Sequence, residues 1–460
     1  MQSSVALPTP TSTLTLELLR LAAPLLLTNL SGVLIGATDT LFMGQISTSA
    51  VAAVGLGSVM FWTLFLLPRG SVNAVVPFTA QAFGAGDTAG LKRWLACFVM
   101  LALICAPLAL LYAPLVPQLL LWSGADGTVQ IQAVSYIHIR LLEMPFGLLS
   151  TVLLGYLIGK GDSRTPMFIT WFVVLCNILL NWVFVFGNLG APRLEIVGSA
   201  LGSAISVTLG AVIAGVIVFR FHVPGFKLVW PVRGEWLSML KIGAPLGIME
   251  CVEVSAFTAF LALIGRIGTD ALAASQIGNQ ISGFAFMPGF ALGTATASLV
   301  GRFIGARSLE MAKRTGYIGV YLGMAWMGAI GTVFWVLAEP LAGAFSHDPA
   351  VVALAASLLR LMCFYQLFDA INIVFRSALA GAGDTRFTAI VTVLLAWTIM
   401  VGGAALLITR FKLGLLEAWL APFVYLTLLA GIYWMRWRSG AWQNLRLGTW
   451  NGEDSRLEQH

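Results

Sequence analysis

The chain has 460 residues, of which 58% are hydrophobic and only 10% are charged. Together with a mean hydropathy of +0.89, this composition excludes an ordinary soluble domain. The formal net charge is +6, but the basic residues are dispersed among short loops, so the charge gives no reason to expect a nucleic-acid partner.

Long apolar runs, separated by short breaks that hold Gly, Pro or charged residues, predict twelve membrane-spanning helices. A bilayer core about 30 Å thick needs roughly twenty apolar residues per crossing. The first half of the chain holds predicted spans at 15–43, 50–82, 94–117, 130–158, 166–188 and 197–221. The second half holds them at 236–265, 271–302, 315–338, 350–380, 388–409 and 415–436. We therefore expect an all-α integral membrane protein.

The two halves repeat one another. LRLAAPL from Leu19 is matched by LKIGAPL from Leu240, 221 positions later, and AVAAVGL from Ala50 is matched by ALAASQI from Ala271 at the same offset. Further on, GKGDSR from Gly159 meets GAGDTR at an offset of 222. The chain is a tandem duplication. Because each half has an even number of spans, the two six-helix lobes enter the membrane in the same orientation, as a parallel repeat.

Basic residues fall mainly in alternate loops, which sets the expected orientation, since Lys and Arg concentrate on the cytoplasmic side. The loops of the opposite side hold only Arg193, Arg266, Arg410 and Lys412. The cytoplasmic side, with both termini, collects Arg20, Lys92, Arg93, Lys160, Arg164, Arg220, Lys227, Arg233, Lys241, Arg302, Arg307, Lys313, Arg314, Arg386, Arg436, Arg438, Arg446 and Arg456.

The domain boundaries follow from the spans and from one polar break. We expect an N-lobe over 1–222, a cytoplasmic linker over 223–235 (VPGFKLVWPVRGE), a C-lobe over 236–437 and a cytoplasmic tail over 438–460. The linker is long and polar enough to let two bundles move separately. The N-terminal MQSSVALPTPTST lacks the basic region of a secretory signal, so we expect the first helix to be retained.

Cysteine and histidine patterns indicate neither a disulfide nor a metal site nor catalysis. The cysteines lie in apolar segments without paired spacing and are expected to pack as small hydrophobes; they are Cys97, Cys105, Cys176, Cys251 and Cys363. The histidines are scattered at His138, His222, His347 and His460. We therefore predict no enzyme activity and no cofactor, and we expect His138 to be a hydrogen-bonded packing residue.

Charged residues inside the predicted spans are the candidate functional groups, because a charge at mid-bilayer costs several kcal/mol on insertion scales. Asp369 lies mid-span, with Tyr365 four residues earlier on the same helix face. Arg140 and Glu143 are three apart, and a mutual ion pair is the simplest interpretation. The other charged residues inside the spans are Asp39, Arg69, Glu250, Glu253, Arg360 and Arg376. We expect the three arginines among them to form ion pairs or to extend toward the membrane surface.

The motifs around these acids resemble those of the multidrug and toxic compound extrusion (MATE) family, over essentially the whole chain. They are ATDTLFMG around Asp39, VEVSAF around Glu253 and FYQLFDA around Asp369. The resemblance implies a V-shaped pair of six-helix lobes. It also implies a NorM-type second lobe in which Glu253, Asp369 and Tyr365 bind the coupling cation, with sodium as a candidate ligand.

For the first lobe, the resemblance implies a coupling site at Asp39, Asn177 and Asn181. Some members place an aspartate where this chain has Asn181, which leaves Asp39 as the only obvious titratable group of a first-lobe site. Glu250, Gln276, Phe284 and Met287 are predicted substrate or accessory residues. Six aromatic and Met side chains could line a cavity for flat cations or could simply pack against neighbouring helices or lipid. They are Phe42, Met43, Trp62, Phe284, Phe286 and Met287.

The function implied is an antiporter of the bacterial inner membrane that exports organic cations in exchange for sodium or protons. A buried carboxylate that one cation neutralises at a time gives exchange by competition. The alternative is a flippase for lipid-linked precursors of the same superfamily, for which a strongly basic cavity is expected. A channel is a further alternative that the sequence does not exclude. We expect the partners to be the lipid bilayer and small organic cations, and the chain to be a monomer.

Overall fold

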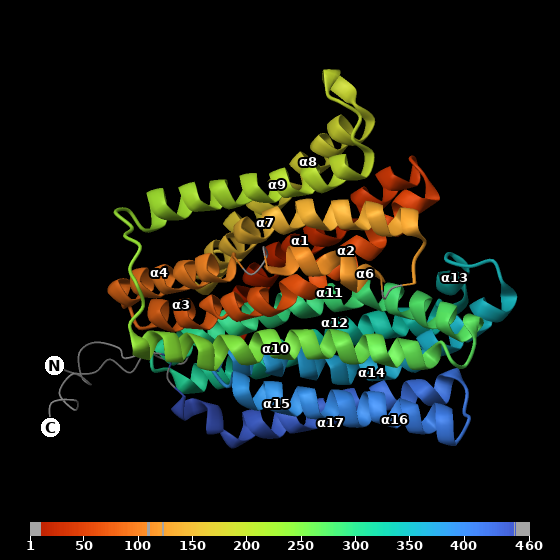
Figure 1. The fold of residues 1–460 in the computed structure, drawn as a ribbon. Coiled ribbons are helices and arrows are strands. Elements are labelled where there is room, and N and C mark those ends of the chain that lie inside the picture. The colour runs from red at the N-terminus through yellow and green to blue at the C-terminus, as the bar shows by residue number, and fades with distance from the viewer. Residues whose placement is uncertain (1–10, 108–110, 122–123, 446, 448–460) are drawn as a thin grey trace, which may run out of the picture. The chain divides into compact units, whose positions relative to one another are not determined.

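The computed structural model describes residues 11–107, 111–121, 124–445 and 447, and the described part is helical throughout (Figure 1). The predicted uncleaved N-terminus and most of the predicted tail lie outside these residues. The first half contains α1 (Thr11–Gly44), α2 (Thr48–Asn73), α3 (Val75–Gly84), α4 (Thr88–Cys105), η1 (Ala113–Leu115), α6 (Val116–Leu121), α7 (Gly127–Gly159), α8 (Arg164–Phe186), η2 (Asn188–Gly190), α9 (Glu195–Ile217) and η3 (Val218–His222).

The second half repeats this order of long helices. It contains α10 (Arg233–Ile264), α11 (Thr269–Gly305), α12 (Leu309–Val336), α13 (Ala338–Gly343), α14 (Pro349–Ala382), α15 (Thr385–Leu395), η4 (Ala396–Val401), α16 (Gly402–Ala405), η5 (Leu406–Arg410), α17 (Leu415–Ser439) and η6 (Ala441–Asn444). The elements from α15 to η5 form one continuous span, Thr385–Arg410, in which η4 and η5 are π-helical turns.

Within the described residues, twelve helices are long and apolar enough to cross a membrane, which confirms the predicted number. The largest difference in bounds is at the third span, predicted over 94–117. The structure begins this helix at Thr88 and ends it at Cys105. Asp87 explains the early start, because its side chain accepts a hydrogen bond from the backbone N–H of Gly90 and so caps the helix. Pro107 explains the early end, since proline disfavours helical backbone at the residue before it.

The chain divides into two compact units. Of the described residues, 27–83 and 87–247 form the N-unit, and 11–26, 84–86 and 248–447 form the C-unit. This division differs from the predicted lobes at the first helix of each half, since α1 and α10 are each shared between the units. Both helices divide two residues after a proline, Pro24 in α1 and Pro245 in α10. Proline removes a backbone hydrogen bond within a helix, so one helix can continue into a second packing environment at that point.

Glycines allow the helices of the N-unit to approach closely. On α9, a Cβ added to Gly198 would lie 2.6 Å from the carbonyl carbon of Phe184 on α8, and one added to Gly202 would collide with the side chain of Asn181. Small residues have this role in membrane bundles, where packing rather than the hydrophobic effect holds helices together. The close contact of α8 with α9 brings Asn181 beside the serines of α9.

The C-unit has an apolar core to which α10, α11, α12, α13, α14 and α17 contribute. Phe260 packs edge-on against Trp419, with ring centroids 5.1 Å apart. At one end of the unit, Trp437 and Trp442 stack with centroids 4.2 Å apart, and both are fully buried. The described start of the predicted tail is therefore part of the folded C-unit.

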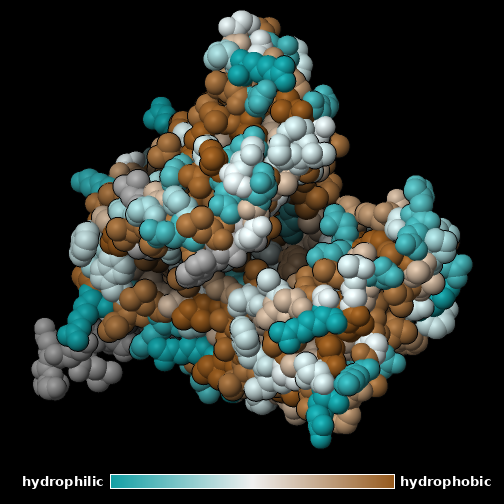
Figure 2. All heavy atoms as spheres, turned by 45° about the vertical axis from the view of Figure 1, so that its right-hand side comes forward, coloured by the Kyte–Doolittle hydropathy of each residue, from teal (hydrophilic) through white to brown (hydrophobic). Residues whose placement is uncertain are grey.

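Apolar side chains also cover much of the outer surface. Figure 2 shows brown hydrophobic residues distributed over the face in view, between white and teal ones. Leu41, Val59 and Phe168 are each more than 60% exposed, although they lie within predicted spans. In a membrane protein such side chains contact lipid rather than water, so their exposure is expected.

Gly198→Ala tests the close contact between α8 and α9. The added methyl group meets backbone that cannot move independently, so the free energy of unfolding in detergent should fall by about 1–3 kcal/mol. Gly55→Ala is the matched control, because no atom lies within 4 Å of its added Cβ. Equal thermal stabilities of the two variants would contradict the packing described here.

Candidate functional site

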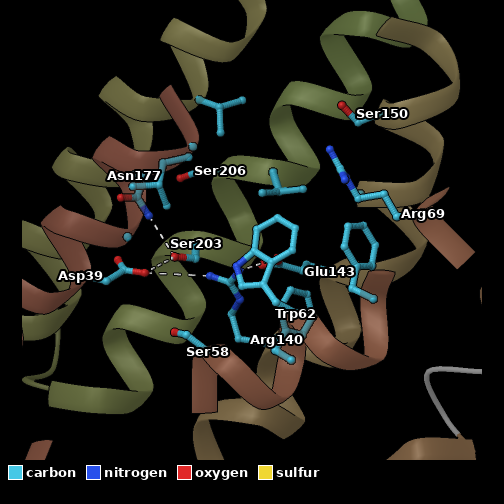
Figure 3. Close-up of a pocket in the computed structure, with 18 of the residues that line it drawn as sticks. Asp39, Ser58, Trp62, Arg69, Arg140, Glu143, Ser150, Asn177, Ser203 and Ser206 are labelled. Carbon is cyan, nitrogen blue, oxygen red and sulfur yellow. Dashed lines mark hydrogen bonds and ion pairs between the residues drawn. The ribbon is translucent and has the colours of Figure 1, made fainter. Parts of the chain in front are cut away.

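A buried carboxylate lies at the centre of the N-unit. Asp39 of α1 is 3% exposed. Its Oδ1 accepts a hydrogen bond of 2.6 Å from Asn181 Nδ2, and its Oδ2 accepts one of 3.1 Å from Ser203 Oγ. Asn177 Nδ2 donates in turn to Ser203 Oγ at 2.9 Å (Figure 3). The structure therefore brings together all three residues predicted for the first-lobe site, with a serine from α9 added.

The local sequence explains this arrangement. Asn177 and Asn181 are four residues apart on α8, which places both amides on one helix face. Both are fully buried, and a buried amide must find hydrogen-bond partners. Asp39 and Ser203 supply them. Ser203 was not predicted, because nothing in an apolar, Ser-rich segment distinguishes one serine from the next.

A buried ion pair adjoins Asp39. Arg140 Nη2 lies 2.9 Å from Glu143 Oε1, which confirms the predicted pair on α7. Arg140 Nη1 also lies 3.9 Å from Asp39 Oδ2, a contact that the sequence did not indicate. The guanidinium lies over the ring of Phe61, 4.7 Å from its centroid. Asp39, Arg140 and Glu143 thus form a charged trio of two carboxylates and one guanidinium.

The trio faces a cavity of about 250 Å³. Its wall combines the charged trio and Arg69 with small polar side chains and an aromatic side (Figure 3). The other lining residues are Gly32, Ile35, Gly36, Ser58, Phe61, Trp62, Phe65, Tyr136, Gly147, Ser150, Thr151, Val173, Asn177, Ser203, Ser206 and Val207. Such a mixture suits a flat organic cation, since aromatic faces attract positive charge and the polar groups orient it.

Several buried polar atoms in this cluster have no hydrogen-bond partner among the residues that the structure describes. They are Arg140 Nε, Glu143 Oε2 and Asn181 Oδ1. Leaving such an atom unpaired costs about 1–3 kcal/mol, more for a charged group. Two of the three are acceptors, so the trio retains capacity to bind a donor.

The C-unit places its predicted cation residues in two hydrogen-bonded groups. Asp369 of α14 is 6% exposed and accepts a hydrogen bond of 3.2 Å from Asn372 Nδ2. Tyr365 is buried one turn earlier on the same helix. Glu253 of α10 instead accepts from Arg376 Nη1 at 2.7 Å, with Tyr425 Oη 3.5 Å from its other oxygen.

Arg376 was expected only to pair or extend toward the surface, and its partner is a predicted site residue. Tyr425 was not predicted, because it lies 172 positions from Glu253. Arg360 also pairs, with Glu339 at 2.9 Å. His138 Nε2 lies 2.9 Å from the carbonyl oxygen of Ala113, which confirms the predicted hydrogen bond, but the residue is exposed, so its predicted packing role is wrong.

The predicted accessory residues are dispersed. Gln276 is exposed, Glu250 and Met287 are half-buried, and Phe284 is 57% exposed. Of the aromatic and Met side chains proposed as a lining, Trp62 lines the N-unit cavity. Met43 is fully buried in the core, so packing is the correct interpretation for it. Phe42 packs against Phe186, with ring centroids 5.4 Å apart.

Comparisons with known proteins now identify the family. The MatE family model matches residues 24–183 and 245–404, one match in each half of the chain. The chain belongs to the MatE family. The resemblance inferred from the motifs is therefore confirmed, and the two matches coincide with the internal repeat.

Relatives of this MatE-family chain extend over most of its length. It is 32% identical over 417 residues to a "Probable multidrug resistance protein NorM" of Pseudomonas putida, covering 86% of this chain and 88% of the relative. It is 28% identical over 432 residues to a protein of the same description from Thermotoga maritima, covering 93% of each. Its fold matches a solved "Outward-facing conformation of a multidrug resistance MATE family transporter of the MOP superfamily", with a TM-score of 0.86, 20% identity and coverage of 94% of this chain and 98% of that one.

A double-mutant cycle tests the bond between Asn181 and Asp39. Asn181→Ala removes a charge-assisted hydrogen bond and should lower the free energy of unfolding by about 1.5–3 kcal/mol. In an Asp39→Asn background the same substitution should cost about 1 kcal/mol less. Asn188→Ala is the control, because its amide donates to the backbone carbonyl of Trp182 rather than to a member of this cluster. Strictly additive effects of Asn181→Ala and Asp39→Asn would contradict the bond.

Proposed function

We propose that the protein is a multidrug efflux antiporter that exports organic, mostly cationic compounds in exchange for sodium ions or protons. The observation that carries this proposal is the buried carboxylate of Asp39 at the wall of an aromatic-lined cavity. The names of the relatives, which describe multidrug resistance proteins, support the same substrate class.

The charge of the trio supports exchange rather than simple binding. Within the trio, two carboxylates and one guanidinium leave one net negative charge, because the second arginine of the cavity, Arg69, lies beside Ser150 instead. A proton, a sodium ion or an organic cation can each balance this charge. Because the net charge is only −1, the trio can neutralise one monovalent cation at a time. Competition for one charge couples the two fluxes, provided that the two ligands favour different conformations in an alternating-access cycle.

The C-unit supplies a second candidate coupling site. Asp369 is buried, with one neutral hydrogen-bond donor beside it. Carboxylate and phenol oxygens are hard ligands, which alkali and alkaline-earth cations prefer. Asp369, Glu253 and Tyr365 therefore remain the proposed sodium ligands of this unit, with Arg376 as the competing partner of Glu253.

A flippase for lipid-linked precursors is the second candidate function. Such a protein needs a strongly basic cavity for the phosphates of its substrate. The N-unit cavity instead holds two acids, Asp39 and Glu143, with two arginines, Arg69 and Arg140. This balance favours the antiporter.

Efflux from reconstituted liposomes tests the antiporter and its coupling site. Asp39→Asn keeps the shape of the side chain and removes its charge. Gradient-driven efflux of ethidium should therefore fall roughly tenfold or more, which corresponds to a loss of about 1.4 kcal/mol or more in cation binding. Sodium and pH gradients are imposed separately to identify the ion. Asp369→Asn and Glu253→Gln measure the C-unit contribution, and Glu310→Gln, in an exposed pair with Arg314, is the control. Unchanged coupling in all three site variants would exclude these roles.

We further propose that the protein lies in the bacterial inner membrane with both termini in the cytoplasm. Residues 386 and 410 lie at the two ends of one span, and both arginines are exposed. In a cysteine-free background, Arg410→Cys should react with a membrane-impermeant maleimide added to intact cells, whereas Arg386→Cys should react only after permeabilisation. The reverse pattern would invert the topology.

A further inference from the structure

We propose that Arg140 sets the charge selectivity of the N-unit cavity, by acting as a built-in cation that leaves room for one additional positive charge. This inference rests on the proposed role of Asp39 as a cation site. It concerns which substrates bind, and it assigns a specificity-determining role to a pair that would otherwise be only structural.

The geometry places Arg140 between two acceptors. Its guanidinium is hydrogen-bonded to Glu143 at 2.9 Å and lies 3.9 Å from Asp39. The second distance is about 1 Å longer than a charge-assisted hydrogen bond. Arg140 therefore neutralises Glu143 and only partly compensates Asp39.

The surroundings allow the guanidinium to shift between the two carboxylates. It lies over the ring of Phe61, and the ring of Tyr136 is 5.8 Å away on its own helix. An aromatic face attracts a cation without fixing its direction as a hydrogen bond does. Within the described part of the chain, Arg140 Nε and Glu143 Oε2 have no hydrogen-bond partner, although both residues are more than nine-tenths buried. Both residues line the cavity, although these two atoms are themselves buried.

The remaining charged residue of the cavity lies elsewhere. Arg69 also lines the cavity, but Figure 3 shows its guanidinium beside Ser150 rather than beside Asp39. Arg69 and Arg140 therefore contribute the same formal charge to one cavity from different positions. The pair provides a matched control, because removing Arg69 changes the total charge and leaves the trio intact.

The consequence is a preference for monovalent cations. With both carboxylates ionised, the trio carries one net negative charge, which a single positive charge balances. A divalent organic cation would bring a second positive charge close to Arg140, and like charges at short range in a low dielectric repel strongly. Removing the guanidinium leaves two negative charges and should favour the divalent ligand.

The test measures binding of two probes to the purified full-length protein in nanodiscs without any gradient. The monovalent probe is tetraphenylphosphonium and the divalent probe is methyl viologen, with dissociation constants from calorimetry. Arg140→Gln should shift the ratio of the two constants toward the divalent probe by roughly tenfold or more. Arg140→Lys, which keeps the charge, should retain the wild-type ratio.

Two further variants separate the trio from total charge and from misfolding. The double variant Arg140→Gln with Glu143→Gln restores one net negative charge and should return the ratio to the wild-type value. Arg69→Gln should shift the ratio much less than Arg140→Gln. The proposal is overturned if folded Arg140→Gln leaves the ratio unchanged, if the double variant fails to restore it, or if Arg69→Gln shifts it equally. Absence of efflux under either gradient would remove the antiport proposal, whereas the binding ratio tests this one separately.

Discussion

The structure of the N-unit depends on the cost of holding an ionised carboxylate inside a helix bundle in a membrane. Asp39 meets this cost with hydrogen bonds from Asn181 and Ser203 and with the nearby charge of Arg140. These partners come from α7, α8 and α9, which must therefore approach α1 closely. The glycines of α9 permit its close contact with α8, which carries Asn181, so packing and chemistry are parts of one constraint.

The duplicated halves meet the same constraint in different ways. In each unit an acid on the first span lies beside an arginine on the fourth, Asp39 with Arg140 and Glu253 with Arg376. The acids do not occupy equivalent positions in the repeat. Phe260 stands 221 positions after Asp39, and Gly32 stands 221 positions before Glu253. The units are thus alike in fold and distinct in chemistry, as expected if the two proposed cation sites have different roles.

The sequence predicted the features that depend on composition and on short spacing. Hydropathy gave the twelve spans, and the three-residue spacing of Arg140 and Glu143 gave their ion pair. It did not predict contacts between distant segments, such as Ser203 with Asp39 or Tyr425 with Glu253. Those contacts depend on how helices rotate against one another, and an apolar sequence with small residues on many faces does not fix that rotation. The packing of Met43 in the core, rather than at a cavity wall, has the same origin.

We propose that the Asp39 carboxylate changes its charge partner when an organic cation binds. Infrared difference spectroscopy on the purified protein, with and without tetraphenylphosphonium at constant pH, measures this directly. We expect a change in the carboxyl or carboxylate bands that is present in the wild type and absent in Asp39→Asn. A difference spectrum that is the same in both proteins would contradict it.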